Sequence, residues 1–241
     1  MSRDDRGQSA VVGVALLLGI TVVSLGILTA SIGAVIDGNA AHADATRVAA
    51  EMDDSLRPIE TTGAHRGHLS FSDGTLGPAA RELRVLNESG VIAQVPVDAL
   101  VFETEEKQVT FLAGAIVQGN PGNANLYRPP PLTASENGGV LVVGAPTLNG
   151  SARSIGASGG ARVTVETTVS HNRTALGNGT YRVAIETATP GAWERYFTEQ
   201  NATVSRTDFD GDGTESVVAT FPGRRTAYLI VHDMRLEVDD G

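Results

Sequence analysis

An uncharged run near the N-terminus is the longest hydrophobic feature of the chain. No charged residue lies between Arg6 and Asp37, so residues 7–36 form thirty consecutive uncharged positions. As a helix this run would extend about 45 Å at roughly 1.5 Å per residue. A bilayer core needs only about 20 such residues. The pattern predicts a helix long enough to span a membrane.

The helical period continues beyond Asp37, but charged residues now occupy the other faces. Arg57-Pro58 should end the helix, because proline disfavours helical geometry at the residue before it. This organisation predicts a leader at 1–7, a helix at 8–57 and a separate domain at 58–241. The apolar positions that keep the period are Ala41, Ala45, Val48, Ala49, Met52 and Leu56.

After Pro58 the apolar period changes from nearly four to two, which is typical of half-buried strands. The predicted strands are separated by Gly, Asn, Pro and Asp clusters and include 82–87, 91–95, 161–169, 181–185, 203–208, 215–221 and 228–236. One helical stretch interrupts them, beginning at Pro190, with Trp193, Tyr196 and Phe197 predicted to lie in the core. Residues 119–139 are predicted to form a long turn-rich loop.

The predicted fold class is therefore α+β. A long N-terminal hydrophobic helix precedes a mainly antiparallel β domain, either a sandwich or a partly open barrel, with one short helix.

Small residues recur along one face of the N-terminal helix. Such a stripe lets helix backbones approach closely where no water drives association, although glycine is also common in membrane helices in general. The predicted packing positions are Ala15, Gly19, Gly26, Ala30 and Gly33.

Arg3 and Arg6 precede the apolar run, which predicts a cytoplasmic N-terminus and an exported C-terminal domain. The run is too long for a secretory h-region of roughly 7–15 residues. Cleavage at a small-residue site near Ala41-His42-Ala43 nevertheless stays an alternative, and it would remove the whole helix.

A short charged leader ends in Arg6-Gly7, followed by Gln8-Ser9-Ala10 and the apolar run. This arrangement resembles the class III signal peptide of archaeal type IV pilins and archaellins, and especially of haloarchaeal pilin-like proteins. The resemblance covers about the first fifty residues. It implies that a prepilin peptidase cuts between Gly7 and Gln8, and that the retained helix packs in a filament core against copies of itself or other pilins. Many pilins carry glutamate at the fifth mature position. Here that position is Val12, which favours a minor pilin or an anchored protein over a major subunit.

The negative net charge of the chain argues against one class of binding partner, the nucleic acids. It has 28 acidic and 18 basic residues, a net charge of −10, and Lys107 as its only lysine. Nucleic-acid binding needs basic patches, so no nucleic-acid partner is predicted. A dense carboxylate surface fits a protein that works in very high salt, and it also fits an ordinary acidic protein. The absence of cysteine excludes disulfides and thiolate metal sites.

Five N-x-[ST] sequons follow the apolar run, on the side predicted to be exported. They predict a glycoprotein modified at one or more positions. Their asparagines are Asn87, Asn149, Asn172, Asn178 and Asn201.

The segment "DFDGDGTES" places Asp208, Asp210 and Asp212 at alternate positions before Gly213. It resembles the first half of an EF-hand-type loop, so calcium is the one predicted cofactor. The twelfth position of such a loop is normally a bidentate glutamate, but here it is Ala219. A solvated acidic turn is the alternative.

Catalytic signals are poor, and no enzymatic activity or catalytic residue is predicted. "GASGG" fits G-x-S-x-G around Ser158, but a nucleophile elbow needs a strand before it and a helix after it. The five histidines lack zinc-ligand spacing beyond the weak His65/His68 pair, and His232 alternates with apolar residues.

The leading hypothesis is a pilin-like surface subunit, inserted in the cell membrane by its N-terminal helix and displaying a β domain outside. The alternative is a single-pass anchored binding protein that does not polymerise. An anchored hydrolase has almost no support from residues.

Overall fold

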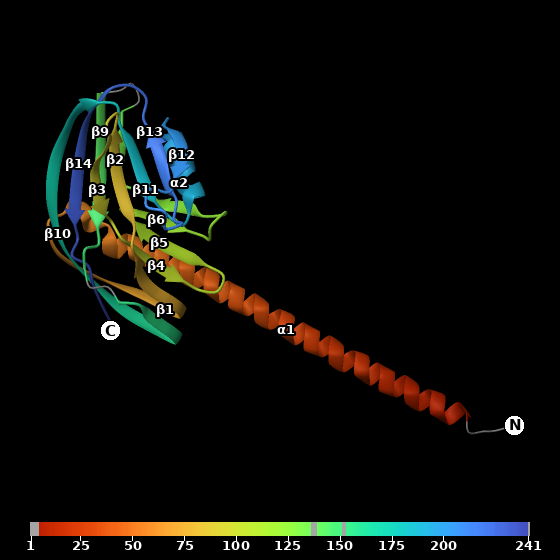
Figure 1. Ribbon diagram of the computed structural model, residues 1–241. Coiled ribbons are helices and arrows are strands. Elements are labelled where there is room, and N and C mark those ends of the chain that lie inside the picture. Colours follow the sequence, from red (N-terminus) through yellow and green to blue (C-terminus); the bar gives the residue numbers. More distant parts are fainter. Residues whose placement is uncertain (1–4, 136–138, 151–152, 241) are drawn as a thin grey trace. The chain divides into compact units, whose positions relative to one another are not determined.

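The computed structural model describes residues 5–135, 139–150 and 153–240, and it places α1 (Asp5–Leu56), a 3-10 helix η1 (Pro58–Glu60) and α2 (Pro190–Glu199) (Figure 1). Two compact units make up the chain, Met1–Ala40 and Ala41–Gly241. Helix α1 ends directly before Arg57-Pro58, where the sequence predicts its end.

Fifteen strands account for most of the secondary structure of the second unit. In chain order they are β1 (Gly63–Ala79), β2 (Glu82–Asn87), β3 (Gly90–Pro96), β4 (Ala99–Glu103), β5 (Gln108–Leu112), β6 (Ala115–Gln118), β7 (Asn125–Arg128), β8 (Leu132–Ala134), β9 (Gly139–Thr147), β10 (Ile155–Gly179), β11 (Arg182–Glu186), β12 (Thr203–Thr207), β13 (Ser216–Thr220), β14 (Arg225–Asp233) and β15 (Glu237–Asp240).

The predicted fold class is wrong, because the described chain is mainly β rather than α+β. The prediction underestimated the strands because β1 and the first part of β10 are rich in glycine and polar residues. Backbone pairing with each other, rather than a regular apolar alternation, makes these segments strands.

The expectation of a long hydrophobic helix capable of spanning a membrane is also corrected. Within the described part of the chain, no helix is long and apolar enough to cross a bilayer.

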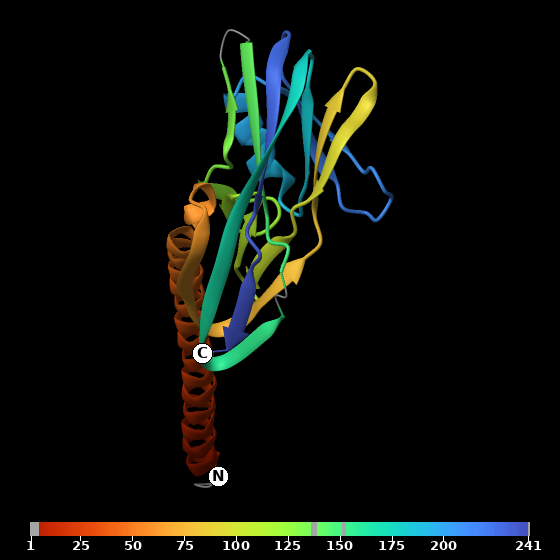
Figure 2. The same cartoon turned by 90° about the vertical axis from the view of Figure 1, so that its left-hand side faces the viewer.

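The strands form a ten-stranded sheet and a five-stranded sheet. The larger sheet has the order β7-β6-β5-β4-β1-β10-β14-β9-β8, with β15 also paired to β10, and the smaller has the order β12-β13-β11-β2-β3. Strand β10 links two regions of the larger sheet, because its first part pairs with β1 and its last part with β14 (Figure 2). The pair β9–β14 is parallel and the other described strand pairs are antiparallel.

Residues 119–139 differ from the predicted loop, since they contain β7, β8 and the first residue of β9. Strand β7 pairs with β6, and β8 pairs with β9. These strands are only three or four residues long, so they leave almost no periodic signal in a sequence rich in asparagine and proline.

Among the described residues of the second unit, buried hydrophobic side chains form two large cores and a small third cluster of Leu86, Ala184 and Val218. The first lies between the two sheets and includes the side chains that β2, β11 and β13 direct inward, together with Trp193, Tyr196 and Phe197 of α2. The placement of these three aromatics in the core confirms the prediction. The second core packs the last part of α1 against β1, β4, β5, β10 and β15.

The last part of α1 carries the predicted amphipathic pattern into this second core. Its fully buried residues are Ala45, Val48, Ala49, Met52 and Leu56.

Polar contacts fix the same segment to β1. Asp44 is itself buried, and its carboxylate accepts hydrogen bonds from the backbone N–H of Ser72 at 2.8 Å and of Asp73 at 3.3 Å. These N–H groups lie at an irregularity in the β1–β10 pairing, where Ser72 has no partner in the register. Residues 41–56 are thus an integral part of the β unit.

Candidate functional site

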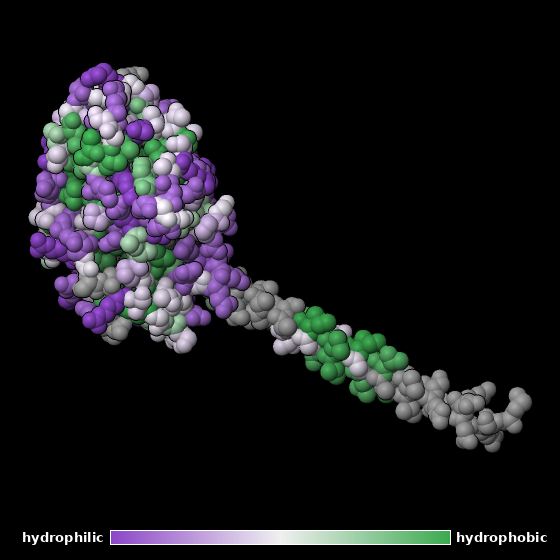
Figure 3. All heavy atoms as spheres, in the orientation of Figure 1, coloured by the Kyte–Doolittle hydropathy of each residue, from purple (hydrophilic) through white to green (hydrophobic). Residues whose placement is uncertain are grey.

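The first candidate site is the apolar segment of α1, which consists of Val14 and residues 16–29. Together with Ala40, these are the residues of the first unit whose side chains the structure describes. All of these side chains are exposed, and ten large hydrophobic ones have exposed fractions of 57–68% (Figure 3). Consecutive residues such as Leu16, Leu17 and Leu18 lie about 100° apart around a helix, so the exposed apolar surface surrounds it. A helix that is apolar all round is normally buried in a large core or a membrane.

Two hydroxyl groups in the apolar segment donate their hydrogen bonds inside the helix. The hydroxyl of Thr21 donates to the Leu18 carbonyl, and that of Thr29 donates to the Leu25 carbonyl, both at 2.8 Å. Internal pairing of this kind removes the cost of placing a hydroxyl in an apolar environment. The segment therefore presents almost purely apolar chemistry to whatever covers it.

Two of the five predicted packing positions have described surroundings. A Cβ atom added at Gly19 or Gly26 would meet no atom within 4 Å. The side chains of Ala15 and Ala30 and the surroundings of Gly33 lie outside the described residues, as do those of Gly7 and Gln8 at the predicted cleavage site. Among the described residues, no neighbouring atom thus requires glycine at Gly19 or Gly26.

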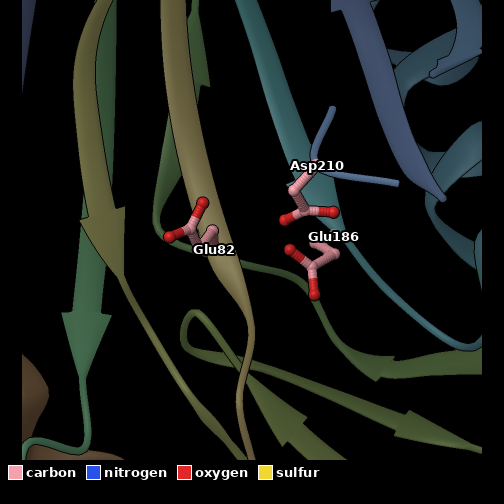
Figure 4. Close-up of side chains that lie close together, drawn as sticks. All are labelled: Glu82, Glu186 and Asp210. Carbon is pink, nitrogen blue, oxygen red and sulfur yellow. The ribbon is translucent and has the colours of Figure 1, made fainter. Parts of the chain in front are cut away.

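The second candidate site is a cluster of three carboxylates on the outer face of the smaller sheet (Figure 4). Strand alternation directs Leu83 and Val85 of β2 into the core between the sheets, and Glu82 and Arg84 to the opposite face. Glu186 at the end of β11 joins Glu82 there. The third carboxylate, Asp210, comes from the loop between β12 and β13, and the three groups have oxygens within 4.8 Å of one another.

Arg84 neutralises much of this cluster. Its guanidinium forms ion pairs with Asp210 at 3.1 Å, with Glu186 at 3.6 Å and with Glu82. It also lies 4.9 Å from the centroid of the Phe209 ring, and the side chain is only 4% exposed. The guanidinium therefore fills the role that a bound cation would have among these carboxylates. The arrangement fastens the β12–β13 loop to β2 and offers little to a catalytic reaction.

Glu186 is the buried carboxyl of the cluster. Burial raises its pKa above the usual range, the charge of Arg81 opposes this effect, and the nearby Asp212 and Asp210 add to the rise. Its protonation thus depends on the pairing with two arginines.

The predicted calcium loop lies beside this cluster. Asp208, Asp210 and Asp212 are exposed and have carboxylate oxygens within 4.8 Å of one another. The Asp208 carboxylate accepts hydrogen bonds from the N–H of Gly211 at 2.8 Å and of Gly213 at 3.2 Å, and the Gly211 bond is the main reason that the pKa of Asp208 is lowered. Both glycines have positive φ, which bends the loop so that these donors face Asp208. Calcium would compete with Arg84 for Asp210.

The remaining sequence features lie apart from both sites. Ser158 is exposed within β10, opposite Asp73 of β1, rather than at a strand-to-helix turn. Among the sequons, Asn87 is half-buried at the end of β2, whereas Asn149, Asn172, Asn178 and Asn201 are exposed. Glycosylation stays a prediction.

The sequence reasoning missed Arg84, Glu82 and Glu186. No local motif connects these residues, because Glu186 and Asp210 lie 102 and 126 positions after Arg84 in the chain. Strands β2 and β11 are neighbours in the smaller sheet, and their pairing brings Glu82 and Arg84 close to Glu186.

A profile described as a family of unknown function (DUF7289) matches residues 6–237. No curated protein and no solved structure matches the chain.

Proposed function

The chain belongs to the DUF7289 family, and we propose that it is a pilin-like subunit, of the minor kind, in an archaeal type IV pilus-like surface structure. The single observation that carries this proposal is the apolar segment of α1, whose ten large hydrophobic side chains are 57–68% exposed. In the proposed assembly this segment packs against copies of itself or other pilins.

The magnitude of this exposure supports the proposal. Full burial of one such side chain is worth about 1.5–3 kcal/mol, so covering ten side chains that are about 60% exposed is worth on the order of 10–20 kcal/mol. Association itself costs an estimated 4–15 kcal/mol. Measured against water, this gain requires the apolar segment to be covered. Between helices in an apolar surrounding, close packing rather than release of water must supply the association free energy.

The proposed topology rests on the residues before the segment. Before processing, Arg3 and Arg6 favour a cytoplasmic position for the N-terminus, and the proposed surface structure displays the β unit outside the cell. A prepilin peptidase that cuts between Gly7 and Gln8 would remove these charges and retain the whole apolar run. The proposed mature protein thus begins directly before its assembly surface.

The attachment of α1 to the β unit fits a subunit that is displayed from a helix. Besides the Asp44 contacts, the Glu51 carboxylate accepts hydrogen bonds from the Ser70 N–H at 2.6 Å and the Ser70 hydroxyl at 2.7 Å. Asp53 pairs with Arg128 at 3.0 Å. These contacts fix the β unit to residues 41–56 rather than to a flexible linker.

Cysteine crosslinking on intact cells tests the proposal, because the natural chain contains no cysteine to interfere. Val23→Cys has a similar side-chain volume and lies in the apolar segment about 40–60° around the helix from Gly19 and Gly26, whereas Ser89→Cys lies in the exposed turn between β2 and β3. A short membrane-permeant bismaleimide should give crosslinked dimers with Val23→Cys and far fewer with Ser89→Cys. Equal yields from the two variants, or none from Val23→Cys, would favour an anchored monomer that does not polymerise.

A further inference from the structure

A groove of about 300 Å³ lies on the larger sheet where β1, β4 and β5 are neighbours (Figure 1). Strand alternation directs Leu100 and Phe102 of β4 into the second core beside α1, so the residues between them face the groove on the opposite side. Paired residues of the three strands form rows across its floor. The two end rows are Thr75, Glu103 and Gln108 at the outer end, and Ala79, Ala99 and Leu112 at the inner end.

Hydrogen-bond donors line the inner end of this groove. In the described contacts of Arg81, its guanidinium donates to the Ala80 carbonyl at 2.5 Å and lies 3.8 Å from Glu186, which leaves several of its five N–H groups for a ligand. Thr187 and Thr189 are buried beside it, and one hydrogen bond of 3.3 Å joins their hydroxyls. Two hydroxyls carry two protons, so within the described contacts one proton of this pair has no acceptor. The inner end thus suits an anionic group.

Hydrogen-bond acceptors line the outer end. Glu103 is exposed, and its carboxylate forms no ion pair with any described residue. Thr75 and Glu103 also line an adjoining groove of about 320 Å³, to which Asp73 and Glu105 add two carboxylates. The buried Oε1 atom of Gln108 accepts no hydrogen bond from the described residues, and such an acceptor is costly. A turn of this amide toward the groove would let a ligand N–H satisfy it, so the outer end suits a cationic donor.

We propose that this groove binds short zwitterionic peptides of two or three residues, with the peptide carboxylate at Arg81 and the peptide ammonium at Glu103. Four residues of β4 separate the two end rows, a distance of about 13 Å at roughly 3.3 Å per residue. A peptide of this length extends at most about 7–11 Å, and the long side chains of Arg81 and Glu103 reach across the remainder. The floor between them includes the apolar side chains of Val101 and Leu112, which suits small apolar side chains of a peptide. The groove lies wholly within the β unit and does not depend on assembly through the apolar segment.

Calorimetric titration of the full-length protein in detergent with trialanine tests this site, and the wild type should bind one equivalent. Two blocked peptides test the two ends separately without changing the protein. Acetyl-trialanine lacks the ammonium and trialanine amide lacks the carboxylate. Each should bind about tenfold more weakly or worse, because each loses a hydrogen bond between charged groups.

A pair of variants assigns the ammonium end to one carboxylate. Glu103 is exposed, so Glu103→Gln keeps the fold, and it should weaken trialanine binding by about tenfold or more. The same variant should leave the affinity for acetyl-trialanine unchanged, because that peptide has no ammonium to lose. Glu106→Gln removes the same charge from the neighbouring turn, outside the groove lining, and should bind trialanine as the wild type does. No heat with trialanine, equal affinities for free and blocked peptides, or equal affinities of Glu103→Gln and Glu106→Gln for trialanine would overturn the proposal.

Discussion

Replacing Gly19 and Gly26 together by leucine should abolish assembly while leaving the individual subunit intact. In the isolated chain a Cβ atom at either position meets no atom within 4 Å, so the added side chains cause no clash. Each replacement also favours the helix by about 1 kcal/mol, because glycine is the poorer helix former. Any loss must therefore arise between subunits.

The expected loss follows from close packing at the proposed contact. Overpacking a well-fitted contact costs about 1–3 kcal/mol per site. Two sites then weaken association by about 2–6 kcal/mol, a factor of roughly 30 to 10⁴ in the association constant. Such a change is large enough to remove most crosslinked dimers.

The assay is the bismaleimide reaction at Val23→Cys, which lies on the glycine face, compared with and without the two leucines. A matched control places leucines at Val14 and Thr21, which are also seven residues apart but on the opposite face of the helix. The control should crosslink as strongly as the parent protein. Full crosslinking of the Gly19→Leu, Gly26→Leu variant, or equal losses in both variants, would refute the assignment of the glycine face as the contact surface.

Three further predictions concern the β unit. Calcium should bind the acidic loop with a Kd of about 10⁻⁴–10⁻³ M, and calorimetry should show a heat signal that Asp212→Asn removes; equal heats would favour a solvated turn. Arg84→Met should destabilise the protein by about 3 kcal/mol, because it leaves Glu186 buried with less compensation, and urea unfolding followed by the fluorescence of the single tryptophan, Trp193, measures this loss. Because the pKa of Glu186 is raised in the folded state, its contribution to stability is greatest below the usual carboxyl pKa and declines as the pH rises through the raised value. Glu186→Gln should remove this decline in the free energy of unfolding. If the wild type and the variant showed the same pH dependence of unfolding, Glu186 would not be its cause.

Local patterns in the sequence predict the elements that local forces determine. The proline at 58 marks the end of α1, and Pro190 marks the start of α2. The Glu88-Ser89-Gly90 turn marks the hairpin of β2 and β3, because each strand carries its own alternation and the turn supplies a glycine with positive φ. These features need no knowledge of distant partners.

The sequence does not predict features that depend on contacts between residues far apart in the chain. The start of β10 contains Ile155-Gly-Ala-Ser-Gly-Gly, which suggests a loop, yet pairing with β1 makes it a strand. Arg84 alternates with apolar residues in β2 and gives no sign that three separate carboxylates surround it. The sequence reveals the acidic loop because its aspartates lie within five residues of one another, whereas the competition between calcium and Arg84 for Asp210 is visible only in three dimensions.

The mature N-terminus is the measurement that tests the pilin-like account most directly. Mass spectrometry of the protein from the cell envelope and from the sheared surface fraction should find a chain that begins at Gln8 in both, and replacing Gly7 by a bulky residue should block this processing. A chain that retains Met1 or Ser2, or one that begins near Asp44 after loss of the entire apolar segment, would contradict the account.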